Sequence, residues 1–578
     1  MVPSSFYARL IVNPEQQSQD AARQRPIISR RSFIEAGTRV GAAFVAAGAG
    51  LDAALISQER VKGGEVGPVA SDRRREQAFE IRLEAARIYL DSEVAPAVTN
   101  GDEECYEDKR ASFSKTLPHS DLGEVDPEAY ATFVSILARG DPAQFERLPA
   151  AAEAEAKFNN PQATYAFEMV GVDSHATRLP PPPRFASAQM ACEMAELYWL
   201  ALTCDIPFLH FDDHPLIKAA VADLNGHTLP VCLGVDGTIT PGTLFRGETP
   251  GELIGPYVSQ FLWLEIPYGI KKIDQRYTFP VRGQNFLTGY ADWLACQRGQ
   301  EPRRKILLDD QPRYVCSNRE LAEYVHHDFS FQAYMNAALI MLQFGEEALS
   351  PTNPYRGSRR QFGDITFGNK NVLSMLAQAS LLGQKGSYYH KWLVHRRLRP
   401  EVFGGRLETC LSGKKSYDIH SDLLQCDAIA RMRASSGTVL LPIAYPEGCP
   451  THPSYPAAHA ANAGACATVL RAFFDEGFTV PKPVQANAEG SALEPWQGES
   501  LTLGNEINKL ASNIALGRDA AGVHYRSDSI QGLRVGEQQA IGLLADYSRT
   551  YNEHFDGFVL TKFDGTKVKI VNGEISVL

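Results

Sequence analysis

Cationic residues and histidines recur at short spacings in three segments of the second half of the chain. Lys391 and Arg399 lie in the first segment, His459 in the second, and Arg518 and His524 in the third. Lysine and arginine donate hydrogen bonds to oxyanions, and a neutral histidine can bind a metal or transfer a proton. The three segments together predict a pocket for a tetrahedral oxyanion.

Two kinds of chemistry suit such a pocket. With a phosphoester, His524 would act as a nucleophile and His459 as an acid. With vanadate, His524 would be an axial ligand through a neutral ring nitrogen, while the cations would neutralise the equatorial oxygens. The residue types alone leave both chemistries open.

The second segment predicts a helix that begins at the pocket. Pro456 has the fixed φ that suits a first helical position, and small residues follow it. The backbone N–H groups of Ala457 and Ala458 would then point out of the helix end, where an anion is favoured. The structural alternative is an ordinary proline-started helix in which His459 is a capping or core residue.

The first segment predicts a partly buried helix over residues 390–399. Lys391 and Arg399 would lie about 80° apart around its axis, with His395 along the same stripe. Trp392 and Leu398 favour burial, and a buried arginine requires an anion. A solvated charged face is the alternative.

The third segment predicts a turn followed by a new helix. Gly522 permits the turn between Arg518 and His524, and Asp528 falls one helical turn after His524. The carboxylate of Asp528 could therefore orient the imidazole. A purely structural His–Asp pair is the alternative.

Composition describes an acidic globular protein large enough for two or more packed units. The 578 residues are 44% hydrophobic and 22% charged, with a formal net charge of -11. This charge gives no electrostatic case for nucleic acid, and no run approaches the ~20 apolar residues of a membrane span. The ten cysteines form no CxxC pair, and histidine clusters at residues 210–214 and 326–328 are interpreted as surface or structural features.

The hydrophobic pattern is helical along most of the chain. We predict helices within residues 77–89, 126–130, 188–202, 251–264, 286–296, 321–349 and 371–399. Only residues 557–570 show a hairpin pattern, around Asp564 and Gly565, and we expect it at the surface. The predicted regions are a leader or flexible extension at 1–70, helical regions at 71–316 and 317–556, and a β-hairpin tail at 557–578. Residues 29–55 resemble a twin-arginine export signal, which would place the protein in the periplasm or outside the cell; localisation is otherwise undetermined.

The ordered pattern of the three segments resembles the vanadium-dependent haloperoxidases, which share a fold and anion site with the type-2 phosphatidic acid phosphatases. The pattern is Lys391, Arg399 and Pro400, then Ser454, Tyr455, Pro456 and His459, then Arg518, His524 and Asp528. Residues 391–401 and 446–455 are similar to the bromoperoxidase branch of red algae and cyanobacteria. The likeness extends over roughly residues 72–570.

The resemblance implies an all-α fold of two four-helix bundles with long loops, assembled as a homo-oligomer. It implies that Lys391, Arg399, Arg518 and the backbone N–H of Ala458 hydrogen-bond vanadate, and that His524 ligates vanadium. It also implies that His459 is the acid–base residue and that His452 lines the halide side.

The chain departs from the family pattern at two adjacent positions. Ala457 stands where many members have serine, and Ala458 stands where they have glycine. Loss of one charge-assisted hydrogen bond of about 1.5–3 kcal/mol would weaken vanadate binding about tenfold or more. Red-algal members also carry a calcium loop before the lysine helix, but residues 353–363 do not match it well enough to assign ligands, so calcium as a structural ion stays open.

The implied activity is oxidation of bromide by hydrogen peroxide to hypobromous acid or an equivalent, which halogenates small organic acceptors. Lys391 would polarise the peroxide and His459 would manage protons. The competing hypotheses are a phosphomonoesterase with His524 as nucleophile and a catalytically silent assembly protein that keeps the fold.

Overall fold

A computed structural model describes residues 71–231, 234 and 236–578. The chain divides into two compact units, Met1–Glu80 and Ile81–Leu578. The segment that resembles an export signal lies outside the described residues. Within the described part, no helix has the length and apolarity needed to cross a membrane.

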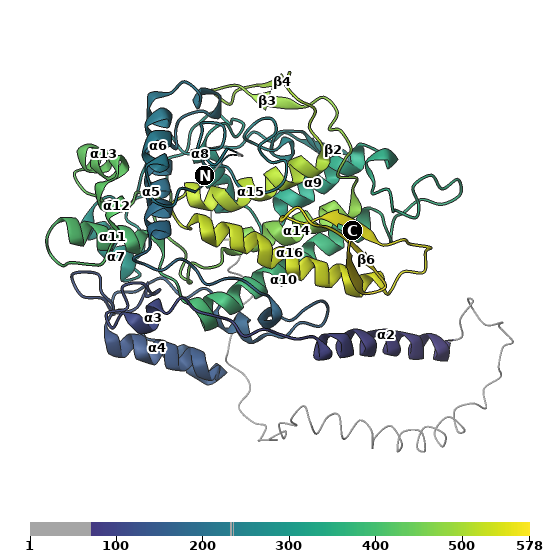
Figure 1. Ribbon diagram of the computed structural model, residues 1–578, viewed down its shortest axis with the longest axis horizontal. Helices are drawn as coiled ribbons and strands as arrows, with labels where there is room; N and C mark the ends of the chain where they lie inside the picture. Colours follow the sequence, from purple (N-terminus) through teal and green to yellow (C-terminus); the bar gives the residue numbers. More distant parts are fainter. Residues whose placement is uncertain (1–70, 232–233, 235) are drawn as a thin grey trace, which may run out of the picture. The chain divides into compact units, whose positions relative to one another are not determined.

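Four long helices form the main core of the larger unit (Figure 1). These are α10 (Asn369–Tyr389), α14 (Ala458–Phe473), α15 (Leu503–Ala520) and α16 (Arg526–Ser548). Small residues let α14 and α16 approach closely, since a Cβ atom on Gly464 would lie 2.0 Å from the Leu533 carbonyl oxygen. A Cβ atom on Gly536 would lie equally close to the carbonyl oxygen of Ala461. The alanine-rich sequence of α14 therefore makes it the centre of the bundle.

Further helices surround this bundle and build a second apolar cluster. Helices α8 (Asn318–His327) and α9 (Gln332–Gln343) contribute buried residues to the main core. The second cluster is built on α5 (Ala188–Thr203), α6 (Pro215–Asn225), α11 (Pro400–Leu411), α12 (Ser421–Gln425) and α13 (Asp427–Ser436). Among the described residues, the other α-helices are α2 (Ser71–Asp91), α3 (Asp102–Cys105), α4 (Pro127–Arg139) and α7 (Tyr290–Gln297). Single turns of 3-10 helix include Gln260–Leu262 and Glu346–Ala348.

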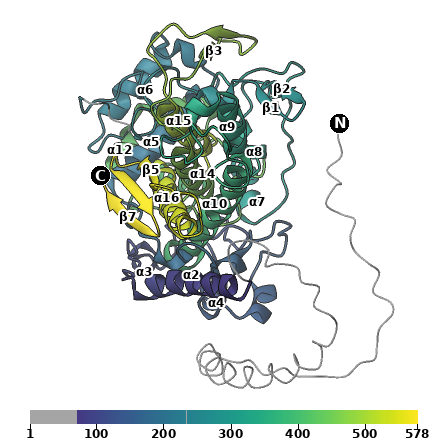
Figure 2. The ribbon, with the colours of Figure 1, turned by 90° about the vertical axis from the view of Figure 1, so that its right-hand side faces the viewer.

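The C-terminal segment forms a three-stranded antiparallel sheet against α14 and α16 (Figure 2). Its strands are β5 (Phe558–Thr561), β6 (Lys567–Val571) and β7 (Glu574–Val577), with Phe558 opposite Ile570. The predicted hairpin is confirmed, and β7 adds a third strand. The expectation of a surface location is wrong, because Phe558, Leu560 and Ile570 are buried in the main core. Two small hairpins, β1 (Ile266–Tyr268) with β2 (Lys271–Ile273) and β3 (Val484–Ala486) with β4 (Leu493–Pro495), complete the strands described.

The mostly helical fold class is confirmed, although several helix bounds differ from the predicted ones. Helix α4 begins at Pro127, where the side chain of Asp126 accepts the Ala129 N–H at 2.8 Å. The prediction over residues 251–264 is wrong, because Gly251 and Gly255 take positive φ and only a 3-10 turn forms. Residues 286–289 precede α7 rather than joining it, and the predicted helix over 321–349 breaks between α8 and α9. The region boundaries at 316 and 556 stay predictions.

Candidate active site for an oxyanion

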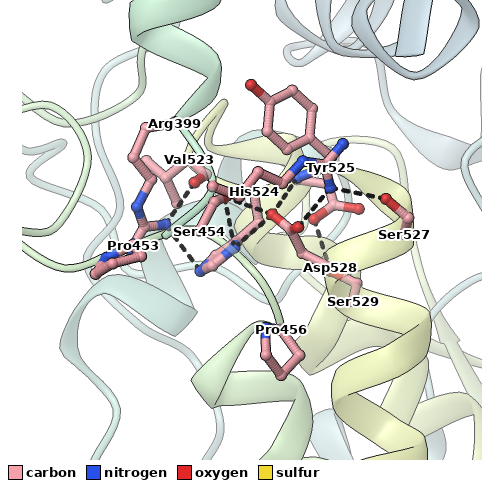
Figure 3. Close-up of polar contacts among 12 residues, drawn as sticks. Arg399, Pro453, Ser454, Pro456, Val523, His524, Tyr525, Ser527, Asp528 and Ser529 are labelled. Carbon is pink, nitrogen blue, oxygen red and sulfur yellow. Dashed lines mark hydrogen bonds and ion pairs between the residues drawn. The ribbon is translucent and has the colours of Figure 1, made fainter. Parts of the chain in front are cut away.

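The three segments converge around His524 in the larger unit, since the charges of Arg399, Lys391, Arg518 and His459 all act on its ring; we call this place the oxyanion pocket. Lys391, Arg399, Arg518, His452 and His524 are all buried. Arg399 and His524 are in direct contact, and residues 453–456 lie beside them (Figure 3). The prediction that these cations and histidines lie close together is confirmed.

Lys391 and Arg399 reach the pocket from different elements, so the single helix predicted over residues 390–399 is wrong. Helix α10 ends at Tyr389 and continues as a π-helix, η7 (His390–His395). Arg396 then takes a left-handed conformation with φ 34°, and Arg399 is the N-cap of α11 with Pro400 at its first position. His395 consequently leaves the predicted stripe and packs edge-on against Tyr455.

Lys391 is a buried cation whose partners are neutral. Its Nζ donates to the carbonyl oxygens of Pro453 at 2.8 Å and Ser454 at 2.7 Å. Burial lowers the pKa of Lys391 well below its ordinary value of 10.5, and the neighbouring charges of Arg399 and Arg518 lower it further. The free energy of the charged ammonium would therefore fall if an anion entered the pocket.

Arg399 is also held by neutral acceptors. Its guanidinium donates to the carbonyl oxygens of His452 at 2.9 Å and Val523 at 2.7 Å (Figure 3). It further contacts Nε2 of His524 at 2.9 Å and Nδ1 of His452 at 3.0 Å. Burial lowers the pKa of Arg399 from its ordinary value.

Arg518 keeps one donor without a partner. Its Nη1 donates to the Val325 carbonyl oxygen at 2.8 Å and to the Tyr445 hydroxyl at 3.2 Å. Its Nε is buried and has no hydrogen-bond partner among the described residues. A buried unsatisfied donor of a cation is costly unless a ligand accepts from it.

His524 is positioned by Asp528, as the sequence predicts. Nδ1 of His524 lies 3.0 Å from Oδ2 of Asp528, which also accepts the Tyr525 N–H and the Ser454 hydroxyl (Figure 3). The pKa of His524 lies well below its ordinary 6.5, first through burial and then through the charge of Arg399. The neutral ring thus carries its proton on Nδ1 and directs the lone pair of Nε2 toward the cations.

The turn before this histidine matches the prediction, and the following helix starts slightly later than expected. Gly522 has φ 77°, which allows the chain to reverse between Arg518 and His524. Helix α16 begins at Arg526 with Tyr525 as its N-cap.

Helix α14 begins two residues later than expected, and this changes which N–H groups are available. Ala457 is the N-cap and Ala458 the first helical residue, so Pro456, preceded by a cis peptide bond, lies outside the helix. The N–H of Ala457 donates to the Asp528 carbonyl oxygen at 2.9 Å, so it cannot serve an anion. No side chain caps α14, and its first N–H groups, beginning with Ala458, are left for a ligand.

His459 lies beside the pocket and is oriented by a carboxylate. Its side chain is 28% exposed, and Nε2 lies 3.0 Å from Oδ1 of Asp328. Asp328 is the C-cap of α8 and its side chain is buried, so this member of the 326–328 cluster does not lie at the surface. The one feature of the sequence that pointed to Asp328 is its position directly after two histidines, where α8 ends.

His452 lies on another side of Arg399 and faces Tyr388. The ring centroids of His452 and Tyr388 are 5.3 Å apart. Burial lowers the pKa of His452 well below its ordinary value, and the charge of Lys391 contributes. Tyr388 was not identified from the sequence, because one tyrosine at the end of a helix has no distinguishing pattern.

The donor set fits vanadate or a similar tetrahedral oxyanion. Three buried cations, one unsatisfied guanidinium donor and an uncapped helix start supply the charge and the hydrogen bonds. The Nε2 lone pair of His524 supplies a metal ligand. At residues 353–363, where the sequence assigns no calcium ligands, the side chain of Asn353 donates to the Phe367 carbonyl oxygen and accepts the Tyr355 N–H.

The other histidine cluster noted in the sequence is structural, as interpreted. Nδ1 of His214 accepts the Leu216 N–H at 3.2 Å and caps the start of α6.

Comparisons with known proteins point to one family. Residues 432–553 match the family model described as the VCPO second helical-bundle domain. The vanadium-dependent bromoperoxidase of Ascophyllum nodosum is 33% identical over 525 residues, which cover 87% of this chain and 93% of that protein. The vanadium-dependent bromoperoxidase of Corallina pilulifera is 33% identical over 591 residues, covering 86% and 98%.

A solved structure supports the same relationship. The homohexameric second vanadate-dependent bromoperoxidase from Ascophyllum nodosum superposes with a TM-score of 0.84 at 28% identity. The match covers 91% of this chain and 96% of that one. Identity over most of both chains, together with a shared fold, shows that this chain belongs to the family of vanadium-dependent bromoperoxidases.

Proposed function

We propose that this protein is a vanadium-dependent bromoperoxidase that uses hydrogen peroxide to oxidise bromide to hypobromous acid or an equivalent, which then halogenates small organic acceptors. One observation carries the proposal. Three buried cations, whose hydrogen bonds go to neutral groups, surround an imidazole whose Nε2 is free of a proton. Family membership favours vanadate as the anion.

The cations and the helix start would hold the cofactor. Arg399, Arg518 and the N–H of Ala458 would donate to its oxygens, and Nε2 of His524 would ligate the metal. Arg399 now donates to Nε2 of His524, so this hydrogen bond must open as the cofactor binds. Bound vanadate supplies a Lewis-acidic centre that activates hydrogen peroxide toward bromide without changing its own oxidation state.

Lys391 would act on the peroxide. Two of its three ammonium protons go to the Pro453 and Ser454 carbonyl oxygens, which fix the head of the side chain. The third proton is available for a peroxide oxygen, and donation there makes the other oxygen more electrophilic toward bromide.

His459 would transfer protons during turnover. The carboxylate of Asp328 holds its ring, while partial exposure connects it to water. His452 would line the halide side, where Arg399 and Tyr388 fix its ring.

We also propose a homo-oligomer, because the solved relative is described as a homohexamer. Calcium is left out of the proposal, because the side chain of Asn353 is used for backbone hydrogen bonds.

Bromination of monochlorodimedone tests the proposed activity. The purified chain, preincubated with orthovanadate, should brominate this acceptor when bromide and peroxide are both present. The same preparation without vanadate is assayed for p-nitrophenyl phosphate hydrolysis. Phosphate release without any bromination would contradict the proposal and favour the phosphomonoesterase.

A further inference from the structure

A buried histidine outside the pocket lacks any hydrogen-bond partner. His227 follows the C-terminus of α6, is 7% exposed, and neither ring nitrogen has a partner among the described residues. Burial lowers its pKa, so the ring is neutral and at least one nitrogen offers a lone pair. Burying two unsatisfied polar atoms is unfavourable, which calls for a ligand.

Two other potential metal ligands face this ring. A carboxylate oxygen of Asp223, Sγ of Cys426 and a ring nitrogen of His227 all lie within 4.8 Å of one another. Asp223 is in the last turn of α6, four residues before His227, and Cys426 is the N-cap of α13. Figure 1 shows α6 and α13 beside α5, so two segments about 200 residues apart in sequence meet here.

The surrounding hydrogen bonds hold Asp223 in place without using all of its acceptor capacity. Oδ2 accepts the indole N–H of Trp199 at 2.8 Å and the Ala428 N–H at 3.2 Å. Oδ1 accepts the Asp427 N–H at 3.0 Å. A carboxylate oxygen can accept twice, so Oδ1 retains a lone pair.

Burial raises the pKa of the Cys426 thiol to about 12, so the thiol is protonated without a metal. The backbone N–H groups of Ile429 and Ala428, at the start of α13, partly offset burial by favouring the charged sulfur. A metal would therefore displace the thiol proton to solvent on binding.

We propose that Asp223, His227 and Cys426 bind a zinc ion, with solvent as the fourth ligand. An imidazole, a thiolate and a carboxylate are the ligands that zinc takes in proteins, whereas calcium and magnesium require oxygen ligands. The zinc ion joins the end of α6 to the start of α13.

A second group of potential ligands, near the oxyanion pocket, is explained without a metal. His327 is 70% exposed and pairs with Glu323 at 3.1 Å. His326 pairs with Glu447 at 2.7 Å and stacks on Tyr445. These histidines have carboxylate partners, so this cluster serves as the control.

Metal binding to the full-length protein tests the proposal. The chain is stripped with a chelator, saturated with orthovanadate, dialysed against zinc, and analysed for metal per chain. We expect one zinc per chain in the wild type, and binding at least about tenfold weaker in Cys426→Ser and in His227→Gln. The controls Cys410→Ser and His327→Gln should retain the zinc.

Cobalt substitution reports on the wild type, so the test does not depend on whether a variant folds. Cobalt in the site should give a thiolate-to-cobalt charge-transfer band that zinc abolishes. Zinc should also raise the thermal midpoint of the wild type but not that of Cys426→Ser. Absence of the charge-transfer band, or undiminished zinc binding in both Cys426→Ser and His227→Gln, would overturn the proposal. Bromination is not measured in this test, so a failure of the proposed function would be detected separately.

Discussion

Buried arginines occupy two contrasting environments in this protein. Arg526 pairs with Glu196, Arg471 with Glu537 at 3.1 Å, and Arg397 with Asp528 at 2.7 Å. In the pocket, Arg399 and Arg518 donate to carbonyl oxygens, a hydroxyl and imidazole nitrogens.

Arginines with carboxylate partners stabilise the fold, whereas the pocket arginines with neutral partners are available to bind an anion. A buried charge with a carboxylate partner is compensated within the chain. A buried charge with neutral partners keeps a net positive field, which becomes favourable when an anion enters. Arg246 and Arg406 are also buried with carbonyl partners, so neutral partners alone do not mark the pocket. What distinguishes the pocket is that the charges of Lys391, Arg399 and Arg518 all act on one imidazole, that of His524.

Removal of His524 should have the largest effect. In His524→Ala the only proposed protein ligand of vanadium is lost, so bromination and vanadium retention should disappear together. Metal analysis after gel filtration, with the bromination assay, measures both. The exposed His554→Ala should behave as wild type, and normal vanadium stoichiometry in His524→Ala would show that the ligand is wrongly assigned.

Replacing one arginine from each environment separates function from stability. Arg518→Met should weaken vanadate binding about 10- to 150-fold, the value of one charge-assisted hydrogen bond of about 1.5–3 kcal/mol. The free energy of unfolding of Arg518→Met without anion should change little, because the substitution also removes the repulsion between Arg518 and the neighbouring cations Lys391 and Arg399. Arg526→Met leaves Glu196 buried and unpaired, and should lower the free energy of unfolding by about 3–5 kcal/mol.

Vanadate titration and denaturant unfolding of both variants provide the comparison. If both variants lose stability to the same extent, the distinction between the two environments is refuted.

Asp328→Asn should slow turnover about tenfold or more while vanadium stays bound. The amide keeps the shape but weakens the orientation of His459, and general acid–base catalysis is worth about 10²–10⁴. Steady-state rates across pH should show a displaced profile. Asp212→Asn, an exposed aspartate, is the matched control; loss of vanadium in Asp328→Asn would place this carboxylate in cofactor binding instead.

Lys391 should make stability and anion affinity depend on pH. Its folded-state pKa lies below the unfolded value of 10.5, so between these two pH values the unfolded chain binds more protons. Unfolding free energy without anion should therefore rise with pH through that window. Vanadate should bind with proton uptake by Lys391, and this contribution weakens affinity by up to about tenfold per pH unit there.

Calorimetric titrations in buffers of different ionisation enthalpy measure the proton uptake. Subtraction of the Lys391→Met data removes the titration of vanadate itself. Equal proton uptake in the two proteins would contradict the assignment.

The sequence predicted the site more accurately than the elements that position it. The turn at Gly522 and the pairing of His524 with Asp528 could be predicted from the sequence, because a glycine turn and an i, i+4 spacing are local features. The π-helix that separates Lys391 from Arg399 could not, since residues 390–399 are compatible with a regular α-helix and tertiary contacts decide. The Asp328–His459 contact joins residues 131 positions apart and depends on packing of α8 against the bundle.

In the C-terminal sheet, too, the local feature could be predicted and the long-range contact could not. The sequence predicted the turn at Asp564 and Gly565. Burial of Phe558 and Ile570 in the main core required the position of α14.

Ala457→Ser should have the smallest effect, and its sign is informative. A serine hydroxyl at this N-cap can donate to the oxyanion and raise vanadate affinity up to about tenfold, or accept from the α14 backbone and add about 1 kcal/mol of stability. Vanadate titration and thermal unfolding distinguish the two. Unchanged affinity with raised stability would mean that the hydroxyl acts as a cap.

Equilibrium titration of the wild-type chain with orthovanadate tests the central claim most directly. We predict one vanadate per chain, competition by phosphate, and binding at least about tenfold weaker in Arg399→Met and in Arg518→Met but not in Lys414→Met, which lies outside the pocket. Absence of saturable vanadate binding in the wild type, or wild-type affinity in both arginine variants, would contradict the account.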